Sequence, residues 1–566
     1  MRGLGVANWD LQLGQLWRKH THIKRFYKAV QRPAEVQFAR LRAIIEANEN
    51  TAFGKAHNFA SVKTYQDFKR RVPACGYEGL EPYIERLKHG EGNQLTAEEP
   101  FMFATTSGTT ARPKFVPITE EHLRDYTHAF QVHNYHMIAD HPGAAVGKFL
   151  IISSNDEDGR VGGRPHGAVS GLLNKRQSPI IRRHFALPFE LCKVKNVESK
   201  YYLLLRAALA QDVTAILGCN PSSFLLLADQ MKLFQDKLLH DIADGTMDGE
   251  LAAASGIDAE RVFAPYLKPD KARAAALGRL LTLHGELKPM HVWPNLALMS
   301  MWKGGPMSFY LEKLSQHYGA LPVRDFGYMA SEGRGTIPLG DQGAAGVLAV
   351  SCHFFEFVAE DDIDSPNPRF YTADELRLGG RYFIHFTTAA GLYRYNINDL
   401  MEVESMFGNT PTLRFVRKGA GISSVTGEKI TEEQVLAALK CAQQAVGGLG
   451  SGLVHFTAEV KMEVPPYYLC YGECERSTLQ LDQAGTARFL SFFDQSLMRQ
   501  NPEYAEKRLS RRLGEPRLEL LPAGTYARLR QQRVQQGAPE AQVKMPLLSC
   551  QGNFSGQLAA MQLAAP

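Results

Sequence analysis

The sequence predicts an α/β protein with a large layered domain followed by a smaller α+β domain. Three observations predict this: a helical amino-terminal segment, a middle region in which short apolar runs alternate with helices, and a change of composition near residue 417. The chain has 566 residues, of which 44% are hydrophobic and 22% charged. These are the fractions of an ordinary globular protein, and the length suffices for two lobes that each bury a core.

The first ninety residues are predicted to be helical. Residues 33–54, PAEVQFARLRAIIEANENTAFG, place apolar side chains three and four positions apart, which is the spacing of one helix face. From about residue 100 the pattern changes to β-rich runs at 147–154, 212–218 and 346–358, with a helical segment at 275–287 between two of them. Strands that alternate with helices predict a mostly parallel sheet covered by helices.

A third sequence pattern begins at residue 417. Residues 417–431, RKGAGISSVTGEKIT, are rich in glycine and serine, and a helical pattern follows them. A hairpin turning at Pro465 and Pro466 comes next, and then two more amphipathic helices. We therefore assign 1–416 to a large domain, 417–428 to a hinge, and 429–566 to a small α+β domain.

Charge, cysteine use and hydropathy exclude several classes of protein. A net charge of +5 without a concentrated basic stripe favours an anionic small molecule over nucleic acid. The eight cysteines are scattered and lack the spacing of a zinc site or a disulfide framework. The most apolar stretch, 201–218, is interrupted by charged residues and predicts a buried helix running into a strand, not a membrane span. We expect a cytoplasmic protein that does not insert into membranes.

A hydroxyl-rich loop is the first candidate site. It lies in the segment 103–119, FATTSGTTARPKFVPIT, and Lys114 follows it. Successive backbone N–H groups in such a loop can hold an anion, and a lysine adds positive charge. The second glycine of a Walker loop is missing. Taken alone, the loop is a candidate phosphate site, but an ordinary surface loop explains the stretch somewhat better.

Two later stretches carry further candidate residues. In 325–340, DFGYMASEGRGTIPLG, Tyr328 can stack on a base, Ser331 can bind a phosphate and Glu332 can hold a hard cation. A capped turn at a strand end explains this stretch as well.

In 387–403, TTAAGLYRYNINDLMEV, the carboxylate of Asp399 can accept two hydrogen bonds from the vicinal hydroxyls of a ribose. A structural ion pair between Arg394 and Asp399 is the alternative for this stretch.

Taken in order, TSGTT…K, YMASEG, YRYNIND and RKG…GEK resemble the nucleotide signature of the acyl-adenylate-forming superfamily, which includes firefly luciferase and the acyl-CoA synthetases. Finer segments at 163–171, 293–314, 352–358 and 423–435 resemble the plant auxin-responsive Gretchen Hagen family of acyl-acid amido synthetases and its bacterial relatives. The likeness extends from about residue 30 to residue 550. It implies a large adenylate-forming domain and a mobile small domain.

The resemblance also implies a role for each matching residue. The phosphate loop would be formed by Thr106, Ser107, Gly108, Thr109 and Thr110. The adenosine and α-phosphate would be held by Tyr328, Ser331, Asp399 and the hinge residue Arg417, and Mg²⁺ by Glu332. In AQVKMPLL, residues 541–548, Lys544 would enter the site during adenylation, which makes Lys544 and Glu332 the catalytic residues.

A few residues depart from the family pattern. Ala111 and Asn398 each stand where a glycine is usual, Pro113 stiffens the approach to Lys114, and Met329 replaces a small residue. Asparagine tolerates a positive φ better than most residues, so the turn before Asp399 is expected to persist. His166, His353 and His385 are expected to be packing residues and not bases.

The function implied is ATP- and Mg²⁺-dependent activation of a carboxylic acid to an acyl-adenylate, followed by transfer to an amine, expected to be an amino acid, with release of AMP and pyrophosphate. Segments 168–172, 222–224 and 299–302 would line the acid site, and their apolar content favours a hydrophobic or aryl acid. We expect a monomer or weak homodimer. Two alternatives stay open: an acyl-CoA ligase, and a non-catalytic ATP or acyl-ligand-binding protein.

Overall fold

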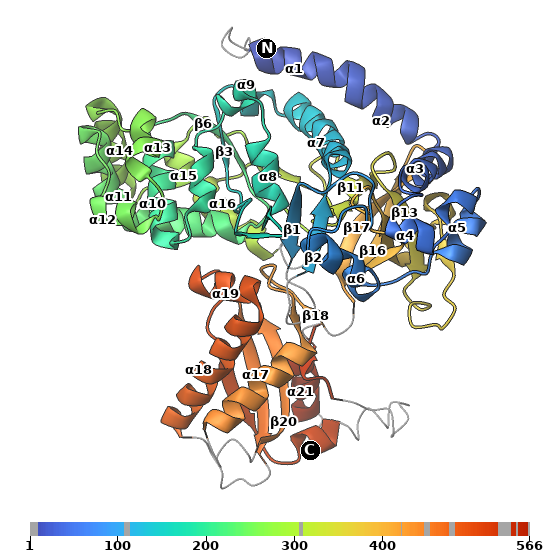
Figure 1. Cartoon of the computed structure of the whole chain (residues 1–566). Coiled ribbons are helices and arrows are strands. Elements are labelled where there is room, and N and C mark those ends of the chain that lie inside the picture. The colour runs from blue at the N-terminus through green and yellow to red at the C-terminus, as the bar shows by residue number, and fades with distance from the viewer. Residues whose placement is uncertain are drawn as a thin grey trace. The chain divides into compact units, whose positions relative to one another are not determined.

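The computed structural model describes residues 9–106, 114–304, 309–419, 422–446, 453–474, 482–529, 545–550 and 553–563. The chain forms two compact units, and the boundary between them falls after Arg417 (Figure 1). Among the described residues, no helix combines the length and the apolar character needed to cross a bilayer.

The amino-terminal residues are helical, as predicted. The helices are α1 (Trp9–Arg18), which a π-helical turn (Lys19–Ile23) joins to α2 (Lys24–Ala29), then α3 (Pro33–Ala47), α4 (Ala52–Ala56), α5 (Tyr65–Arg71) and α6 (Tyr77–Lys88), with a 3-10 turn at Phe59–Ser61. Local signals set their starts. Pro33 occupies the first turn of α3, the Thr51 hydroxyl caps α4, and Thr64 with Asp67 forms a capping box on α5.

A four-stranded parallel sheet lies in the middle of the first unit. Its order is β3-β6-β7-β8, and its three pairings are all parallel. The strands are β3 (Lys148–Ile151), β6 (Val213–Leu217), β7 (Leu298–Met301) and β8 (Val323–Asp325). The apolar stretch at 201–218 is a buried helix followed by β6, as predicted.

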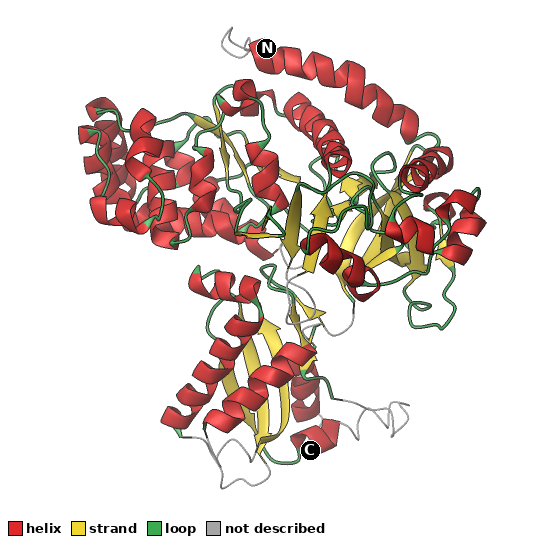
Figure 2. Ribbon diagram, in the orientation of Figure 1, coloured by secondary structure: helices red, strands yellow, loops and turns green. Residues whose placement is uncertain are grey.

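Helices cover and connect these strands (Figure 2). They are α7 (Glu120–Asp140), α8 (Val169–Lys175), α9 (Pro179–Arg182), α10 (Val197–Ala208), α11 (Ser222–Asp244), α12 (Gly249–Ala254), α13 (Ala259–Phe263), α14 (Lys271–His284), α15 (Pro289–Val292) and α16 (Phe309–Tyr318), with 3-10 turns at Pro142–Ala145, Phe189–Lys193 and Ala264–Tyr266. A second sheet of order β2-β1-β5-β4 contains β1 (Met102–Thr106), β2 (Lys114–Ile118), β4 (Gly159–Val161) and β5 (Arg164–Gly167).

The largest sheet is antiparallel, and here the prediction of a mostly parallel sheet is wrong. It has seven strands in the order β11-β12-β17-β16-β15-β13-β14, and the registers of β11 with β12, β12 with β17, and β15 with both β13 and β16 are antiparallel. Its members are β11 (Thr336–Ile337), β12 (Gly346–Leu348), β13 (Phe354–Ala359), β14 (Phe370–Tyr371), β15 (Arg381–Thr387), β16 (Tyr395–Phe407) and β17 (Thr410–Lys418), with a 3-10 turn at Ala373–Glu375. Short connections join these strands, whereas a parallel pair needs a crossover of a dozen or more residues.

The second unit is α+β. It contains the pair β18 (Ile422–Ser423) and β19 (Ile430–Thr431), helices α17 (Glu432–Ala445), α18 (Gln483–Gln500), α19 (Pro502–Leu509) and α21 (Phe554–Leu563), and a sheet of β20 (Leu453–Lys461), β21 (Tyr467–Cys474), β22 (Arg517–Leu521) and β23 (Leu548–Ser549). β20 and β21 form the expected hairpin, with Lys461 opposite Tyr467. One apolar cluster joins α17 and α18 to this sheet.

Candidate functional site

A tight hairpin in the first unit carries two of the predicted site residues. Strands β9 (Met329–Ala330) and β10 (Gly333–Arg334) pair antiparallel with Ala330 opposite Gly333. Ser331 and Glu332 are therefore the two residues of the turn. The two residues are neighbours in the candidate stretch 325–340, and the structure shows that they lie at the tip of a hairpin.

Contacts to both strands fix this hairpin. The Tyr126 hydroxyl, from α7, donates a hydrogen bond to the Ala330 carbonyl at 2.5 Å. On the other strand the Arg334 N–H donates to His353 Nε2 at 3.1 Å. His353 approaches so closely that a Cβ on Gly333 would lie 2.9 Å from its Nε2 atom, so any larger residue at 333 would displace the His353 ring.

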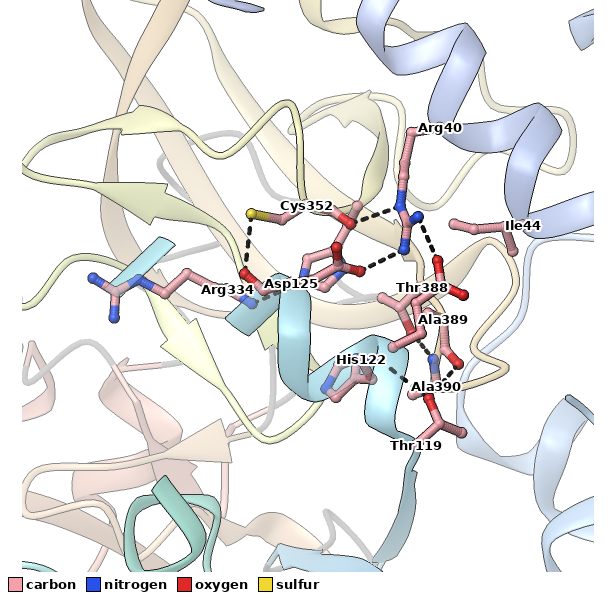
Figure 3. A network of polar contacts seen from close by, with 12 residues as sticks. Arg40, Ile44, Thr119, His122, Asp125, Arg334, Cys352, Thr388, Ala389 and Ala390 are labelled. Atoms are coloured by element: carbon pink, nitrogen blue, oxygen red, sulfur yellow. Dashed lines mark hydrogen bonds and ion pairs between the residues drawn. The ribbon is translucent and has the colours of Figure 1, made fainter. Parts of the chain in front are cut away.

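A polar network holds α7 in place beside the hairpin (Figure 3). The Arg40 guanidinium, from α3, donates to Asp125 Oδ2 at 2.5 Å and to the Cys352 carbonyl at 2.9 Å. At the start of α7 the Thr119 hydroxyl donates to the Ala389 carbonyl at 3.0 Å and caps the helix by accepting from the His122 N–H. These bonds tie α7 to the loop before β13 and to the loop after β15.

Buried neutral histidines lie on α7 and beside it. The rings of His122 and His353 stack with centroids 5.6 Å apart. Burial lowers the pKa of His122 to about 4 and the pKa of His353 far below its ordinary value. His353 is an uncharged hydrogen-bond acceptor and His385 is buried in the sheet, which confirms that both are packing residues.

Glu332 presents a buried carboxylate with spare coordination capacity. The residue is 5% exposed, and among the described residues its carboxylate accepts one hydrogen bond, from the Tyr395 hydroxyl at 3.4 Å. The described residues contain no group of three or more metal-ligating side chains. A single buried carboxylate fits Mg²⁺, which proteins usually hold through one or two carboxylates together with phosphates and water.

Tyr328 and Asp399 are hydrogen-bonded to each other. The Tyr328 hydroxyl donates to Asp399 Oδ2 at 2.5 Å. Burial, followed by the charge of Asp399, raises the pKa of Tyr328 well above its ordinary value, so the phenol remains a donor. The Phe415 ring lies parallel to Tyr328, at 6° between planes and 6.1 Å between centroids. Asn398 adopts φ 61°, which confirms the turn expected before Asp399.

The alternative of an ion pair between Arg394 and Asp399 is wrong. The Arg394 Nε–H instead contacts both oxygens of Glu356, at 3.0 and 2.9 Å, and the Nη1 atom donates to the Val72 carbonyl. The Glu356 carboxylate also accepts a hydrogen bond from Tyr65 at 2.8 Å. Arg394, the residue before β16, thus joins the large sheet to the amino-terminal helices.

The remaining predicted residues are placed in part. Arg417 lies on β17, two positions beyond Phe415, and its guanidinium donates to Glu360 at 2.7 Å. Thr106 is the last residue of β1. Outside the described residues lie Ser107, Gly108, Thr109, Thr110 and Lys544.

The structure therefore gathers Tyr328, Glu332 and Asp399 at one place in the first unit. Hydrogen bonds join Tyr328 to Asp399 and Tyr395 to Glu332, and the charge of Glu332 adds to the raised pKa of both tyrosines. Sequence reasoning missed Tyr126 and the contact of Tyr395. Tyr395 stands inside the YRYNIND stretch, whereas nothing in the sequence distinguishes Tyr126 from an ordinary packing residue.

Known proteins resemble this chain over most of its length. The chain matches the GH3 family N-terminal domain at 22–323, the GH3 family central domain at 346–418 and the GH3 family C-terminal domain at 433–553. It is 24% identical to the indole-3-acetic acid-amido synthetase GH3.3 of Arabidopsis thaliana, over 92% of this chain and 90% of that protein. It is also 24% identical to the jasmonoyl-L-amino acid synthetase GH3.5 of Oryza sativa subsp. japonica, over 93% and 94% of the two chains.

A solved structure shares the fold. The AtGH3.15 acyl acid amido synthetase in complex with 2,4-DB superposes with a TM-score of 0.66 at 19% identity, over 96% of each chain. The family expected from the sequence motifs is thereby confirmed. Since three consecutive domain models together match most of its residues in order, the chain belongs to the GH3 family.

Proposed function

We propose that this protein uses ATP to convert a carboxylic acid into an acyl-adenylate and then transfers the acyl group to an amino acid, forming an amide. The observation that carries the proposal is the grouping of Tyr328, Glu332 and Asp399 in a chain that matches the GH3 family along its length. The choice of an amino acid as acceptor rests on the named activity of the rice relative. Free cysteines support a cytoplasmic location.

The first step joins two anions. A carboxylate oxygen attacks the α-phosphorus of ATP, the bond to pyrophosphate breaks, and pyrophosphate leaves with that electron pair. A carboxylate is a poor electrophile, and the mixed anhydride supplies AMP as a good leaving group. Catalysis of such a step consists mostly of positioning and charge neutralisation.

Each residue has a role in that step. The Asp399 carboxylate would accept hydrogen bonds from the ribose hydroxyls, and the Tyr328 hydroxyl would hold it in position. The Tyr328 ring would contact adenine. Ser331 and the loop from Thr106 to Thr110 would donate hydrogen bonds to the phosphates. Bound Mg²⁺, held by Glu332, would supply positive charge to those phosphates.

In the second step the amine nitrogen attacks the acyl carbon. The bond between that carbon and the phosphate oxygen breaks, AMP leaves, and the nitrogen loses a proton to water. Residues 417–428 would act as a hinge that lets the second unit rotate between the two steps. Small-angle scattering is expected to differ between the ATP-bound state and the state with AMP and acid, and identical profiles would contradict the rotation.

The acid would bind beside Tyr328. The Trp302 indole donates to the Gly327 carbonyl at 3.1 Å, so the segment 299–302 adjoins the residue before Tyr328. Phe224 and Met299 are buried nearby in the same apolar cluster. These contacts support a hydrophobic or aryl acid.

The direct test is to incubate the protein with ATP, Mg²⁺, pooled carboxylic acids and pooled amino acids, and to search by mass spectrometry for AMP and new amides. Amides that require both pools are the expected result. A parallel reaction with coenzyme A tests the alternative of an acyl-CoA ligase, which would give a thioester. No AMP with any acid would instead indicate a non-catalytic binding protein.

Replacing Lys544 by alanine is expected to slow adenylate formation by about 10²-fold or more and amide formation far less, because the first step crowds more negative charge. Pyrophosphate exchange measures the first step, and aminolysis of a supplied acyl-adenylate measures the second. Lys440→Ala, an exposed lysine of α17, is the matched control. Equal slowing of both steps would contradict the assigned role.

Asp399→Asn is expected to raise the KM for ATP by about tenfold or more, and Tyr328→Phe by about tenfold, because each removes part of one charge-assisted hydrogen bond. The double variant should be less impaired than the product of the single effects, since the two residues share that bond. Asp364→Asn, at an exposed position, is the control. Fully independent effects would show that the bond is absent in the working enzyme.

A further inference from the structure

Helix α1 has its polar contacts on the inside and its large apolar side chains on the outside. Facing the body of the first unit, the Gln15 amide donates to the Tyr135 carbonyl at 3.0 Å and the Arg18 guanidinium donates to Gln131 Oε1 at 2.6 Å. Asp10 pairs with His184 at 2.9 Å, and Leu11 is buried. Figure 1 shows α1 along the outer edge of this unit, beside α7.

The solvent-facing side of α1 carries four large apolar residues. Trp9 is 65% exposed, Leu13 54%, Leu16 55% and Trp17 53%. Their spacing of three and four residues places them on one face of the helix. A water-facing helix normally has the opposite arrangement, and a contiguous exposed apolar patch usually marks an interaction site.

The segment that continues from this face has a net positive charge. Residues 11–34 contain no aspartate or glutamate and six basic residues. Lys19, Lys24, Arg25 and Lys28 are exposed, on the π-helical turn and on α2. A helix with a Trp and Leu face and neighbouring lysines is typical of helices that lie in the headgroup layer of a membrane.

We propose that α1, the π-helical turn and α2 form a peripheral docking surface for an anionic lipid bilayer. Trp9, Leu13, Leu16 and Trp17 would enter the layer between headgroups and acyl chains, while the exposed lysines would contact lipid phosphates and carboxylates. A second copy of this chain that used the same face would offer the exposed lysines no acidic partner, because residues 11–34 lack aspartate and glutamate.

The test uses the full chain and sedimenting vesicles, either of phosphatidylcholine alone or with about 30% phosphatidylserine. Binding to the anionic vesicles, weakened by salt, is expected. In the triple variant Leu13→Gln, Leu16→Gln, Trp17→Gln, the partition coefficient onto the anionic vesicles should fall about tenfold or more. The variant Lys19→Gln, Lys24→Gln, Lys28→Gln should lose about fivefold for each charge removed.

Two control variants separate this surface from a general effect on solubility or charge. One replaces Leu233, Leu283 and Leu378, which are 62%, 74% and 70% exposed elsewhere in the first unit, by glutamine. The other replaces the exposed residues Lys268, Lys271 and Arg279 by glutamine.

Both controls are expected to bind vesicles like the parent. The proposal is overturned if the parent binds neither vesicle, if the controls lose binding equally, or if the α1 variant abolishes self-association in sedimentation velocity while vesicle binding persists.

Discussion

Replacing Glu332 by glutamine is expected to slow acyl-adenylate formation by about 10³-fold. The substitution keeps the shape of the side chain at the tip of the β9–β10 hairpin and removes the charge that would hold Mg²⁺ against the phosphates. Pyrophosphate exchange at increasing Mg²⁺ concentration measures the effect. The maximal rate should fall, and the Mg²⁺ concentration that gives half of that rate should rise. Glu332→Asp, which retains the charge, should recover part of the activity.

Stability should be nearly unaffected by this substitution. The one hydrogen bond to the carboxylate described above is long, 3.4 Å, so its loss should cost about 1 kcal/mol or less of unfolding free energy. Glu404→Gln, at an exposed position of β16, is the matched control for loss of a negative charge. Full activity of Glu332→Gln at saturating Mg²⁺ would remove Glu332 from the metal site.

Acidification is expected to destabilise the fold steeply below about pH 6.5. Burial lowers the pKa of several buried histidines: to about 4 for His122 and His385, to about 3 for His128, and well below the ordinary value for His133 and His353. The unfolded chain binds these protons at about pH 6.5, whereas the folded chain does not. Stability is therefore present above about pH 6.5, is lost as the pH falls below it, and levels off below the folded pKa values.

The size of this effect can be estimated. At about pH 5 each such histidine costs about 2 kcal/mol, or about 10 kcal/mol for the five together, which is comparable with the whole stability of a typical domain. Urea unfolding midpoints between about pH 7.5 and 5 measure it.

One histidine can be removed to test the assignment. His122→Phe should reduce the proton uptake on unfolding by about one proton, because the substitution replaces a stacked, neutral ring by another aromatic ring. His240→Gln, whose ring is 76% exposed, should change nothing. An unaltered slope in His122→Phe would show that its ring is not kept neutral by burial.

The sequence predicted the elements better than their pairing. The runs at 147–154 and 212–218 are β3 and β6, and the apolar run before β6 is α10, because their periodicity and turn signals are local. The run at 346–358 is two strands, β12 and β13, of an antiparallel sheet. Strands buried on both faces have the same apolar pattern in parallel and antiparallel sheets, so composition did not distinguish them.

The site was predictable as motifs but not as contacts. Tyr328 and Asp399 are 71 positions apart, and their hydrogen bond exists because strand β16 passes beside the hairpin. Arg394 pairs with Glu356 on β13. Glu356 lies in the family-like segment 352–358, but nothing in the sequence indicated that it would pair with Arg394. Tyr126 and His353 hold the hairpin through a backbone carbonyl and a backbone N–H, and such contacts leave no trace in residue type.

The two-residue turn at Ser331 and Glu332 also constrains how this protein could be re-engineered. Side chains alternate between the faces of a strand, so a one-residue shift in the pairing of β9 with β10 would turn the side chains of the shifted strand to the opposite face. Libraries that vary loop length should leave the octapeptide from Tyr328 to Gly335 untouched. Substitutions at 299–302, the segment proposed above to adjoin the acid, leave the length of this octapeptide unchanged.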